Sequence, residues 1–179
     1  MAAAGMPKIE REHVVAHFEM TESWLADEVT GLSPVQLNFR YAPGKWTIIE
    51  VLEHLVIAEP MYWAGLQKSV KEAPAKAKNA STDEDMLWYG IDRTNRQKTQ
   101  TKEEPVGKLK DAQAGLASFR KLRAEMLNYA KTTEDDLRGH LFTDWGVDAY
   151  QGLIGISTHS QRHILQIREI KAQHDFPKK

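Results

Sequence analysis

The amino-acid sequence predicts an all-α protein built as a helical bundle. Apolar residues recur at intervals of three and four along four long segments, as expected for helices with one buried face. The alternation of apolar and polar residues that is typical of β-strands is almost absent. With 179 residues, of which 41% are hydrophobic and 27% charged, the chain is long enough for one core. We therefore expect a single bundle domain over residues 1–179.

The first helix is expected from about Lys8 to Gly31, after a flexible tail over residues 1–8. Glycine commonly follows the last turn of a helix, so Gly31 is a suitable end. Ser33 and Pro34 then have the order of an N-cap and the first residue of a short helical turn. The inward face of the first helix is marked by Val14, Phe18, Leu25 and Val29.

The second helix has the clearest start in the sequence. Thr47 and Glu50 have the spacing of a capping box, in which each side chain binds a backbone amide of the first turn. The helix is expected to continue to about Lys71. Pro60 predicts a kink or a break near Glu59, because proline has no amide hydrogen for the helical ladder.

The second half of the chain predicts two more long helices. One is expected to begin just after Pro105, with Val106, and to extend through Met126; the other covers about Asp148 to Gln173. The segments between the long helices are rich in polar and turn-forming residues. We expect a polar linker (72–80), a short helical piece (83–97) and an irregular stretch (140–146).

Charge and composition exclude several classes of protein. The 24 basic and 25 acidic residues leave a net charge of −1, so we expect neither nucleic acid nor an anionic membrane as a partner. Cysteine is absent, which excludes thiolate ligands and cysteine nucleophiles. No apolar run approaches the roughly 18 residues of a membrane span. The N-terminal segment lacks the apolar region of a secretory signal, and we expect a cytoplasmic protein.

Histidines are the candidate functional residues. Two pairs have the i, i+4 spacing that places both rings on one helical face, namely His13 with His17 and His159 with His163. The second pair shares its face with Ile156, which predicts that it faces the bundle interior. The first pair lies beside the apolar stripe of its helix, and we expect no metal there.

His54 is the candidate third ligand, because it lies on a mostly apolar helix, although a single buried histidine is more often a structural residue. Three neutral ligands with one open position are typical of catalytic zinc sites. Glu50 and Gln166 are placed to line the pocket or to orient a ligand ring, while Glu50 is also explained by the capping box alone. The residues alone identify no general base. Tryptophans at helix ends could line a cavity, but we expect Trp46 to be a packing residue.

Two segments resemble a known family. Residues 44–55 (GKWTIIEVLEHL) are similar to the GKW[ST]xxExxxHL segment of the DinB-like superfamily, and residues 148–167 resemble its DAYQ…HxxRHxxQI helix. The resemblance covers almost the whole chain. It implies an antiparallel four-helix bundle with a long crossover, a homodimer, and a metal held by His54, His159 and His163.

The resemblance also suggests a reaction class. Relatives transfer small thiols such as bacillithiol, use mycothiol in isomerisation or are described as hydrolases. We expect one divalent ion per chain, namely zinc, nickel or iron, which activates a thiol or water for transfer to, or hydrolysis of, a small-molecule substrate such as a low-molecular-weight thiol. Two alternatives stay open. One is a non-catalytic metal-binding or stress-response protein with a structural or vestigial site; the other is a dimeric interaction module whose histidines only form hydrogen bonds.

Overall fold

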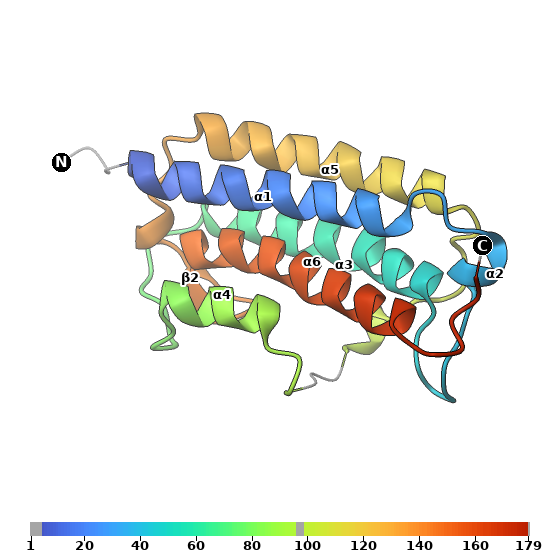
Figure 1. The fold of residues 1–179 in the computed structure, drawn as a ribbon. Coiled ribbons are helices and arrows are strands. Elements are labelled where there is room, and N and C mark those ends of the chain that lie inside the picture. The colour runs from blue at the N-terminus through green and yellow to red at the C-terminus, as the bar shows by residue number, and fades with distance from the viewer. Residues whose placement is uncertain (1–4, 96–98, 179) are drawn as a thin grey trace.

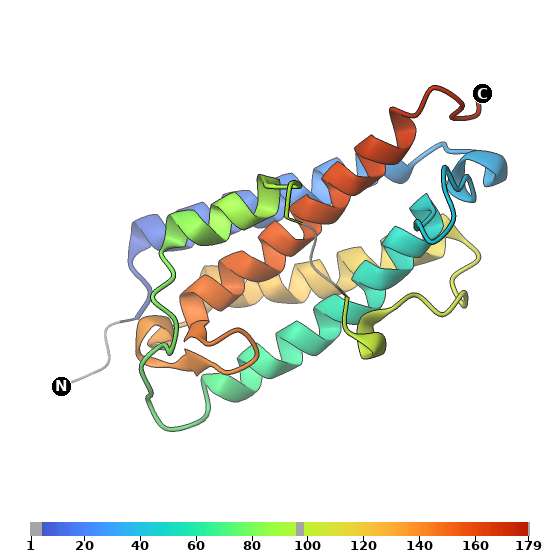
Figure 2. The same ribbon diagram turned by 90° about the horizontal axis from the view of Figure 1, so that it is seen from below.

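Four long helices lie side by side in the computed structural model, which describes residues 5–95 and 99–178 (Figure 1). They are α1 (Lys8–Val29), α3 (Ile48–Ser69), α5 (Ala112–Thr132) and α6 (Ala149–Lys171). Helices α1 and α3 each pack against both α5 and α6. Helices α3 and α5 run in the same direction, so the chain between them must cross the length of the bundle (Figures 1 and 2). The predicted four-helix bundle with a long crossover is confirmed.

Short elements fill the connections between the long helices. They are α2 (Pro34–Leu37), α4 (Asp83–Ile91), two 3-10 turns, η1 (Thr101–Glu103) and η2 (Leu137–Gly139), and two strands, β1 (Leu141–Phe142) and β2 (Val147–Asp148). The strands pair antiparallel across the stretch that we expected to be irregular. The short helical piece expected to reach Gln97 ends at Ile91 instead, and Gln97 itself lies outside the described residues.

Helix α3 begins as predicted. The Thr47 hydroxyl accepts from the Glu50 amide, and the Glu50 carboxylate accepts from the Thr47 amide, which completes the capping box. The helix then continues through Pro60 to Ser69, so the expected break does not occur. Pro60 is exposed, where water can bind the carbonyl that the missing amide hydrogen leaves free.

The start of α5 differs from the prediction, because the chain from Pro105 to Asp111 is irregular. The carboxylate of Glu53, on α3, accepts hydrogen bonds from the amides of Gly107, Lys108 and Leu109 at 2.7–3.2 Å. Gly107 has a positive φ of 73°, which a side chain would disfavour. Glu53 therefore satisfies amides that would otherwise favour an earlier helix, and it fixes the crossover against α3.

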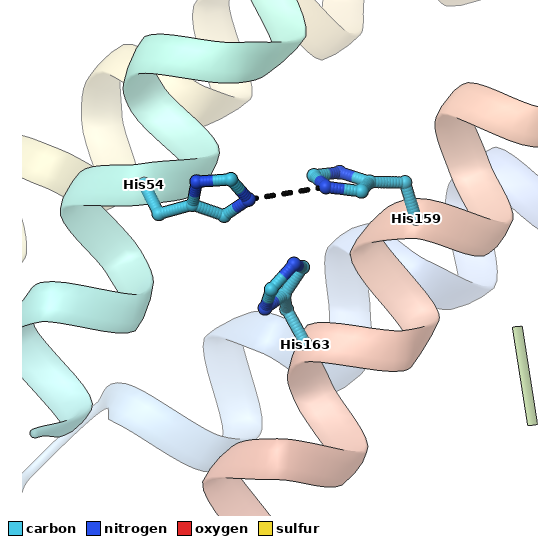
Figure 3. Close-up of side chains that lie close together, drawn as sticks. All are labelled: His54, His159 and His163. Carbon is cyan, nitrogen blue, oxygen red and sulfur yellow. Dashed lines mark hydrogen bonds between the residues drawn. The ribbon is translucent and has the colours of Figure 1, made fainter. Parts of the chain in front are cut away.

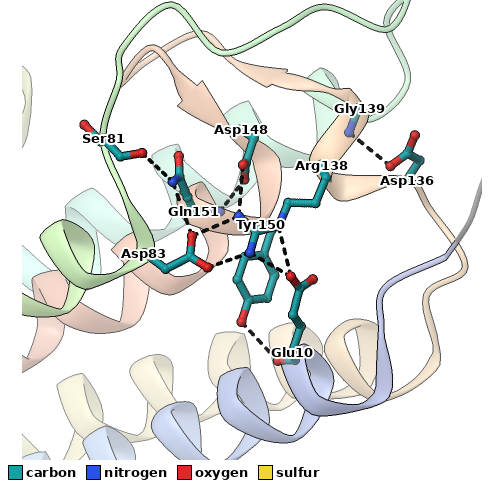
Figure 4. Close-up of polar contacts among 9 residues, drawn as sticks. All are labelled: Glu10, Ser81, Asp83, Asp136, Arg138, Gly139, Asp148, Tyr150 and Gln151. Atoms are coloured by element: carbon teal, nitrogen blue, oxygen red, sulfur yellow. Dashed lines mark hydrogen bonds and ion pairs between the residues drawn. The ribbon is translucent and has the colours of Figure 1, made fainter.

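Helix α4 is held against the N-terminal end of α6. The Arg138 guanidinium binds carboxylates of Glu10, Asp83 and Asp148 at 2.6–3.0 Å and lies over the Tyr150 ring (Figure 4). Farther along α4, a Cβ at Gly90 would lie 2.9 Å from the Cβ of Thr158, so only glycine permits this close approach. These contacts position α4 over the part of α6 that carries the predicted ligands.

A fully buried ion pair lies in the core. The side chains of Arg123 on α5 and Glu59 on α3 are both 0% exposed and 3.0 Å apart, and Arg123 also donates to Ser160 on α6. The guanidinium stacks between the rings of Phe18 and Phe119, with centroid distances of 4.5 and 4.8 Å. This cluster joins all four long helices.

The expected N-terminal tail is partly ordered. Residues 1–4 lie outside the described residues, but Met6 is buried in the core beside α1. Within the described residues, none of the helices is both long and apolar enough to span a membrane.

Candidate metal centre

The three predicted ligands converge at one point inside the bundle. His54 comes from α3, and His159 and His163 come from α6, one turn apart, with their rings turned toward one another (Figure 3). One nitrogen atom from each ring lies within 4.8 Å of the other two. All three side chains are buried, with exposed fractions of 1%, 5% and 8%. The antiparallel packing of α3 and α6 thus brings His54 next to two residues that lie about a hundred positions later in the sequence.

The His54 ring is oriented by the crossover. Its Nδ1 donates to the backbone carbonyl of Glu103, in η1, at 2.7 Å. A carbonyl only accepts, so Nδ1 must carry the hydrogen, and in the neutral ring Nε2 keeps its lone pair. Nε2 is also the atom that faces His159. Metal-binding histidines commonly have such a partner on the second nitrogen.

The two histidines of α6 are held differently. His163 Nδ1 lies 2.9 Å from the amide oxygen of Gln166, which again leaves Nε2 free for a ligand bond. Gln166 therefore has the orienting position that we predicted. His159 Nδ1 is buried and lacks a hydrogen-bond partner among the described residues, so this ring is held by the hydrogen bond at its Nε2 and by packing against the Tyr62 ring.

The environment keeps the imidazoles neutral. Burial lowers the pKa of His159 and His163 well below the ordinary value, and the neighbouring histidines act in the same direction. Burial also lowers the pKa of His54, although the Glu103 carbonyl opposes this shift. Neutral imidazole is the form that binds a metal ion.

The spacing of the nitrogens fits a shared ion. Two nitrogens at about 2.0–2.1 Å from a tetrahedral ion would be roughly 3.3 Å apart. The Nε2 atoms of His54 and His159 are 3.1 Å apart. The three side chains could therefore hold one divalent cation through nitrogen alone.

The first histidine pair does not reach this cluster. His13 is exposed, while His17 is partly buried and its Nδ1 lies 2.7 Å from the Ser157 hydroxyl. Among the described residues, His54, His159 and His163 are the only group of three or more possible metal ligands whose ligand atoms lie close together. The boundary position predicted for the first pair agrees with this arrangement.

A cavity of about 590 Å³ opens onto the histidines. Its wall includes the aromatic residues Trp46, Tyr62, Tyr89 and Trp145. Trp46 packs against the hydrophobic core, as expected, and in addition its ring stacks on the His163 ring, with the centroids 6.1 Å apart, and lines the cavity. A volume of this size is in the range of small-molecule sites.

Of the two glutamates near the site, Glu103 rather than Glu50 reaches the cavity. Glu50 does not line the cavity: one oxygen binds the Thr47 amide and the other binds Arg40 at 2.7 Å. Glu103, which sequence reasoning missed, is 4% exposed and lines the cavity. Its neighbours Glu104 and Pro105 are typical of a solvated connection, so the sequence carried no sign of this burial.

Fold and site together define a four-helix bundle protein with a buried three-histidine cluster in a cavity. The model of the DinB superfamily matches residues 17–167, and the chain belongs to this superfamily. The uncharacterized protein YuaE of Bacillus subtilis (strain 168) is 32% identical over 158 residues, which are 84% of this chain and 91% of YuaE.

A solved structure has the same fold. YfiT from Bacillus subtilis is described as a probable metal-dependent hydrolase with an unusual four-helix bundle topology. It aligns with a TM-score of 0.65 and 19% sequence identity, over 93% of this chain and 88% of YfiT.

Proposed function

We propose that this protein is a metal-dependent enzyme that activates a thiol or a water molecule at one divalent ion held by His54, His159 and His163. The observation that carries the proposal is the convergence of three buried, neutral imidazoles at the wall of a cavity of about 590 Å³. The description of YfiT as a probable metal-dependent hydrolase supports the same class of chemistry. A bound divalent ion would act as a Lewis acid and make a thiol or water nucleophilic at neutral pH.

The residues of this chain have separable roles in the proposal. The Glu103 carbonyl and the Gln166 amide hold the His54 and His163 rings with Nε2 toward the common point. Trp46 and Tyr62 contact the histidine rings and keep bulk water from this side of the cluster. Burial keeps the ligands neutral, so the positive charge of the ion stays undiminished for the ligand in the open position.

The substrate in this proposal is a small molecule, and a low-molecular-weight thiol is the first class to test. The cavity wall includes the rings of Trp46, Tyr62, Tyr89 and Trp145, which suit the apolar part of a substrate. The cavity at the histidines also favours a catalytic site over a structural metal site, because structural sites have closed ligand shells. A homodimer, which the family resemblance implies, belongs to the same proposal and is testable by light scattering.

The proposal is tested by metal analysis followed by a substrate screen. Purified protein incubated with zinc, nickel or iron(II) should retain about one ion per chain. The His54→Ala, His159→Ala and His163→Ala variants should not. The loaded protein is then assayed for thiol transfer to electrophiles and for hydrolysis of esters and amides. A protein that binds the ion but has no activity in either screen would favour the non-catalytic metal-binding alternative.

A further inference from the structure

A guanidinium lies at the cavity wall without an anionic partner. Arg162, on α6, is 4% exposed and lines the cavity. Its Nη1 donates to the backbone carbonyls of Tyr89 and Asp92, and its Nη2 donates to the carbonyl of Asn95. Within residues 5–95 and 99–178, Arg162 forms no ion pair with a carboxylate. A buried positive charge without an anion beside it destabilises the folded protein, so an anion bound here would be favourable.

Two hydrogen-bond donors of this guanidinium remain without a partner. A guanidinium has five N–H donors, and the three carbonyls occupy three of them. The Nε–H group and one N–H of Nη2 are left over among the described residues. The Nε atom is not one of the unpaired side-chain atoms that are sealed from solvent in this part of the chain, so a ligand in the cavity can reach it. Nε–H and an N–H of Nη2 form an edge with which arginine binds both oxygens of a carboxylate.

The Tyr89 hydroxyl adds a donor beside this edge. Tyr89 lies on α4 and lines the same cavity, and the centroid of its ring is 5.0 Å from Arg162 Cζ. Its hydroxyl has no hydrogen-bond partner among the described residues and is not sealed from solvent. Burial raises the pKa of this hydroxyl, and the Arg162 charge opposes the shift without reversing it. The phenol therefore keeps its hydrogen at neutral pH and can donate it to a ligand.

The charges around the cavity suit a ligand group with a single negative charge. The charged residues that line it, among those described, are Lys45, Asp85, Arg93, Glu103 and Arg162. Since the histidines are neutral, a bound divalent ion would add two positive charges to these. The balance with the ion in place is positive, which favours an anionic ligand. The two carboxylates on the wall would repel a doubly charged phosphate more than a carboxylate.

We propose that Arg162 and Tyr89 bind a carboxylate of the substrate, and that the substrate of the metal centre is a small molecule with a carboxylate besides its reacting group. The inference rests on the proposed function, because it names the substrate class of the same site. Arg162, Tyr89 and the three histidines line one cavity of about 590 Å³, so one small molecule can contact both places. The inference concerns binding alone, and no covalent bond forms or breaks.

A charged probe and its neutral counterpart test this inference in the metal-free protein. Wild-type protein and the Arg162→Gln and Tyr89→Phe variants are titrated with benzoate and with benzamide at neutral pH, in a buffer without carboxylate or phosphate. Isothermal titration calorimetry gives the affinities. Benzamide has nearly the same shape as benzoate but no charge. Because no ion is present, benzoate cannot bind to a metal instead of to the cavity wall.

Two further variants are matched controls. Arg168→Gln removes the same charge from the same helix, but Arg168 is paired with Glu28 and does not line the cavity. Tyr129→Phe removes a phenol hydroxyl that donates to Asp135, also away from the cavity. Thermal melting is measured for every variant.

Wild-type protein should bind benzoate about tenfold more tightly than benzamide, and Arg162→Gln and Tyr89→Phe should each bind benzoate about tenfold more weakly than wild type, because a hydrogen bond between a charged group and its partner contributes roughly tenfold in affinity. Both controls should match wild type. If Arg162→Gln does not fold, because its carbonyl contacts hold the end of α4, the Tyr89→Phe variant decides, since it loses one oxygen and keeps the ring.

The outcomes separate this inference from the proposed function. Equal affinities of wild type for benzoate and benzamide, or no binding of benzoate, would overturn the inference. Wild-type benzoate affinity in folded Tyr89→Phe would overturn the part of Tyr89, and the same affinity in folded Arg162→Gln would overturn the part of Arg162. Neither result bears on the metal, whose retention is measured separately. A protein that selects benzoate but retains no divalent ion would overturn the proposed function, and with it the assignment of the carboxylate to a substrate of the ion.

Discussion

The Nε2 atoms of His54 and His159 lie 3.1 Å apart, although the two residues belong to different helices. His54 presents a lone pair at this atom, because its Nδ1 hydrogen is donated to the Glu103 carbonyl. The hydrogen bond between the two atoms therefore takes its hydrogen from His159 Nε2, and a cation bound between them would replace that hydrogen. The metal site that we propose is therefore the arrangement in which both lone pairs have the same partner.

Removal of a single ligand should abolish tight metal binding. The His54→Ala, His159→Ala and His163→Ala variants should each lose more than the roughly hundredfold affinity associated with an outer hydrogen bond. Affinity is measured by competition with a chromophoric chelator. The double variant His13→Ala/His17→Ala is the control and should bind metal like wild type, since His13 is exposed and neither residue belongs to the cluster. If the His13→Ala/His17→Ala variant lost the metal while the three single variants kept it, the ligands would be His13 and His17 and the proposed site would be wrong.

Removal of the Gln166 amide should weaken metal binding without abolishing it. Its oxygen lies 2.9 Å from His163 Nδ1 and holds the ring with Nε2 toward the cluster. We expect Gln166→Ala to lower metal affinity about 10- to 100-fold, as is usual for such partners. Gln166→Glu, which keeps an acceptor, should retain the affinity. Equal metal affinities of Gln166→Ala and the control Gln173→Ala would contradict an orienting role of Gln166.

The stability of the metal-free protein should fall as the pH drops below about 6.5. The unfolded chain takes up protons on histidine near that pH, whereas burial holds the folded pKa of His163 well below it. Below pH 6.5 the unfolded state therefore binds more protons. The free energy of unfolding then falls by up to about 1.4 kcal/mol per pH unit for each histidine that stays neutral. Above that pH the contribution is constant.

Urea titrations between pH 7.5 and 5.5 check this dependence. The His163→Gln variant should show a slope that is shallower than wild type by about one proton, because it lacks one of the buried groups. His174→Gln is the control, and its slope should equal that of wild type, since His174 is 97% exposed. Identical slopes for wild type and His163→Gln would show that His163 is protonated equally in both states.

Removal of one partner of the buried ion pair should destabilise the protein far more than replacement of both partners by apolar side chains. Arg123→Met leaves the Glu59 carboxylate in the core without its cation, and the free energy of unfolding should fall by about 3–5 kcal/mol. The double variant Arg123→Met/Glu59→Met should recover most of this loss, because no unpaired charge remains. Arg120→Met, which removes a half-exposed arginine from the same helix, should change stability by less than about 1 kcal/mol. Urea unfolding measures all three.

The sequence by itself determined the features that depend on neighbours along the chain. The Thr47–Glu50 capping box, the helical faces and the one-turn spacing of His159 and His163 are local, so the order of residues defines them. His54 was predicted as the third ligand from its place on a mostly apolar helix and from the resemblance of the motif around it to a family, and the structure brings the three rings together.

Only the tertiary structure decided which carboxylate reaches the cavity and where α5 begins. Glu103 contacts His54 from 49 positions away, and Glu53 satisfies amides more than 50 positions away. These contacts join a side chain to the backbone of an irregular crossover, and such contacts produce no repeating pattern of apolar residues. The sequence could therefore identify Glu50 by its local spacing, while the role of Glu103 depends on how the crossover packs against α3.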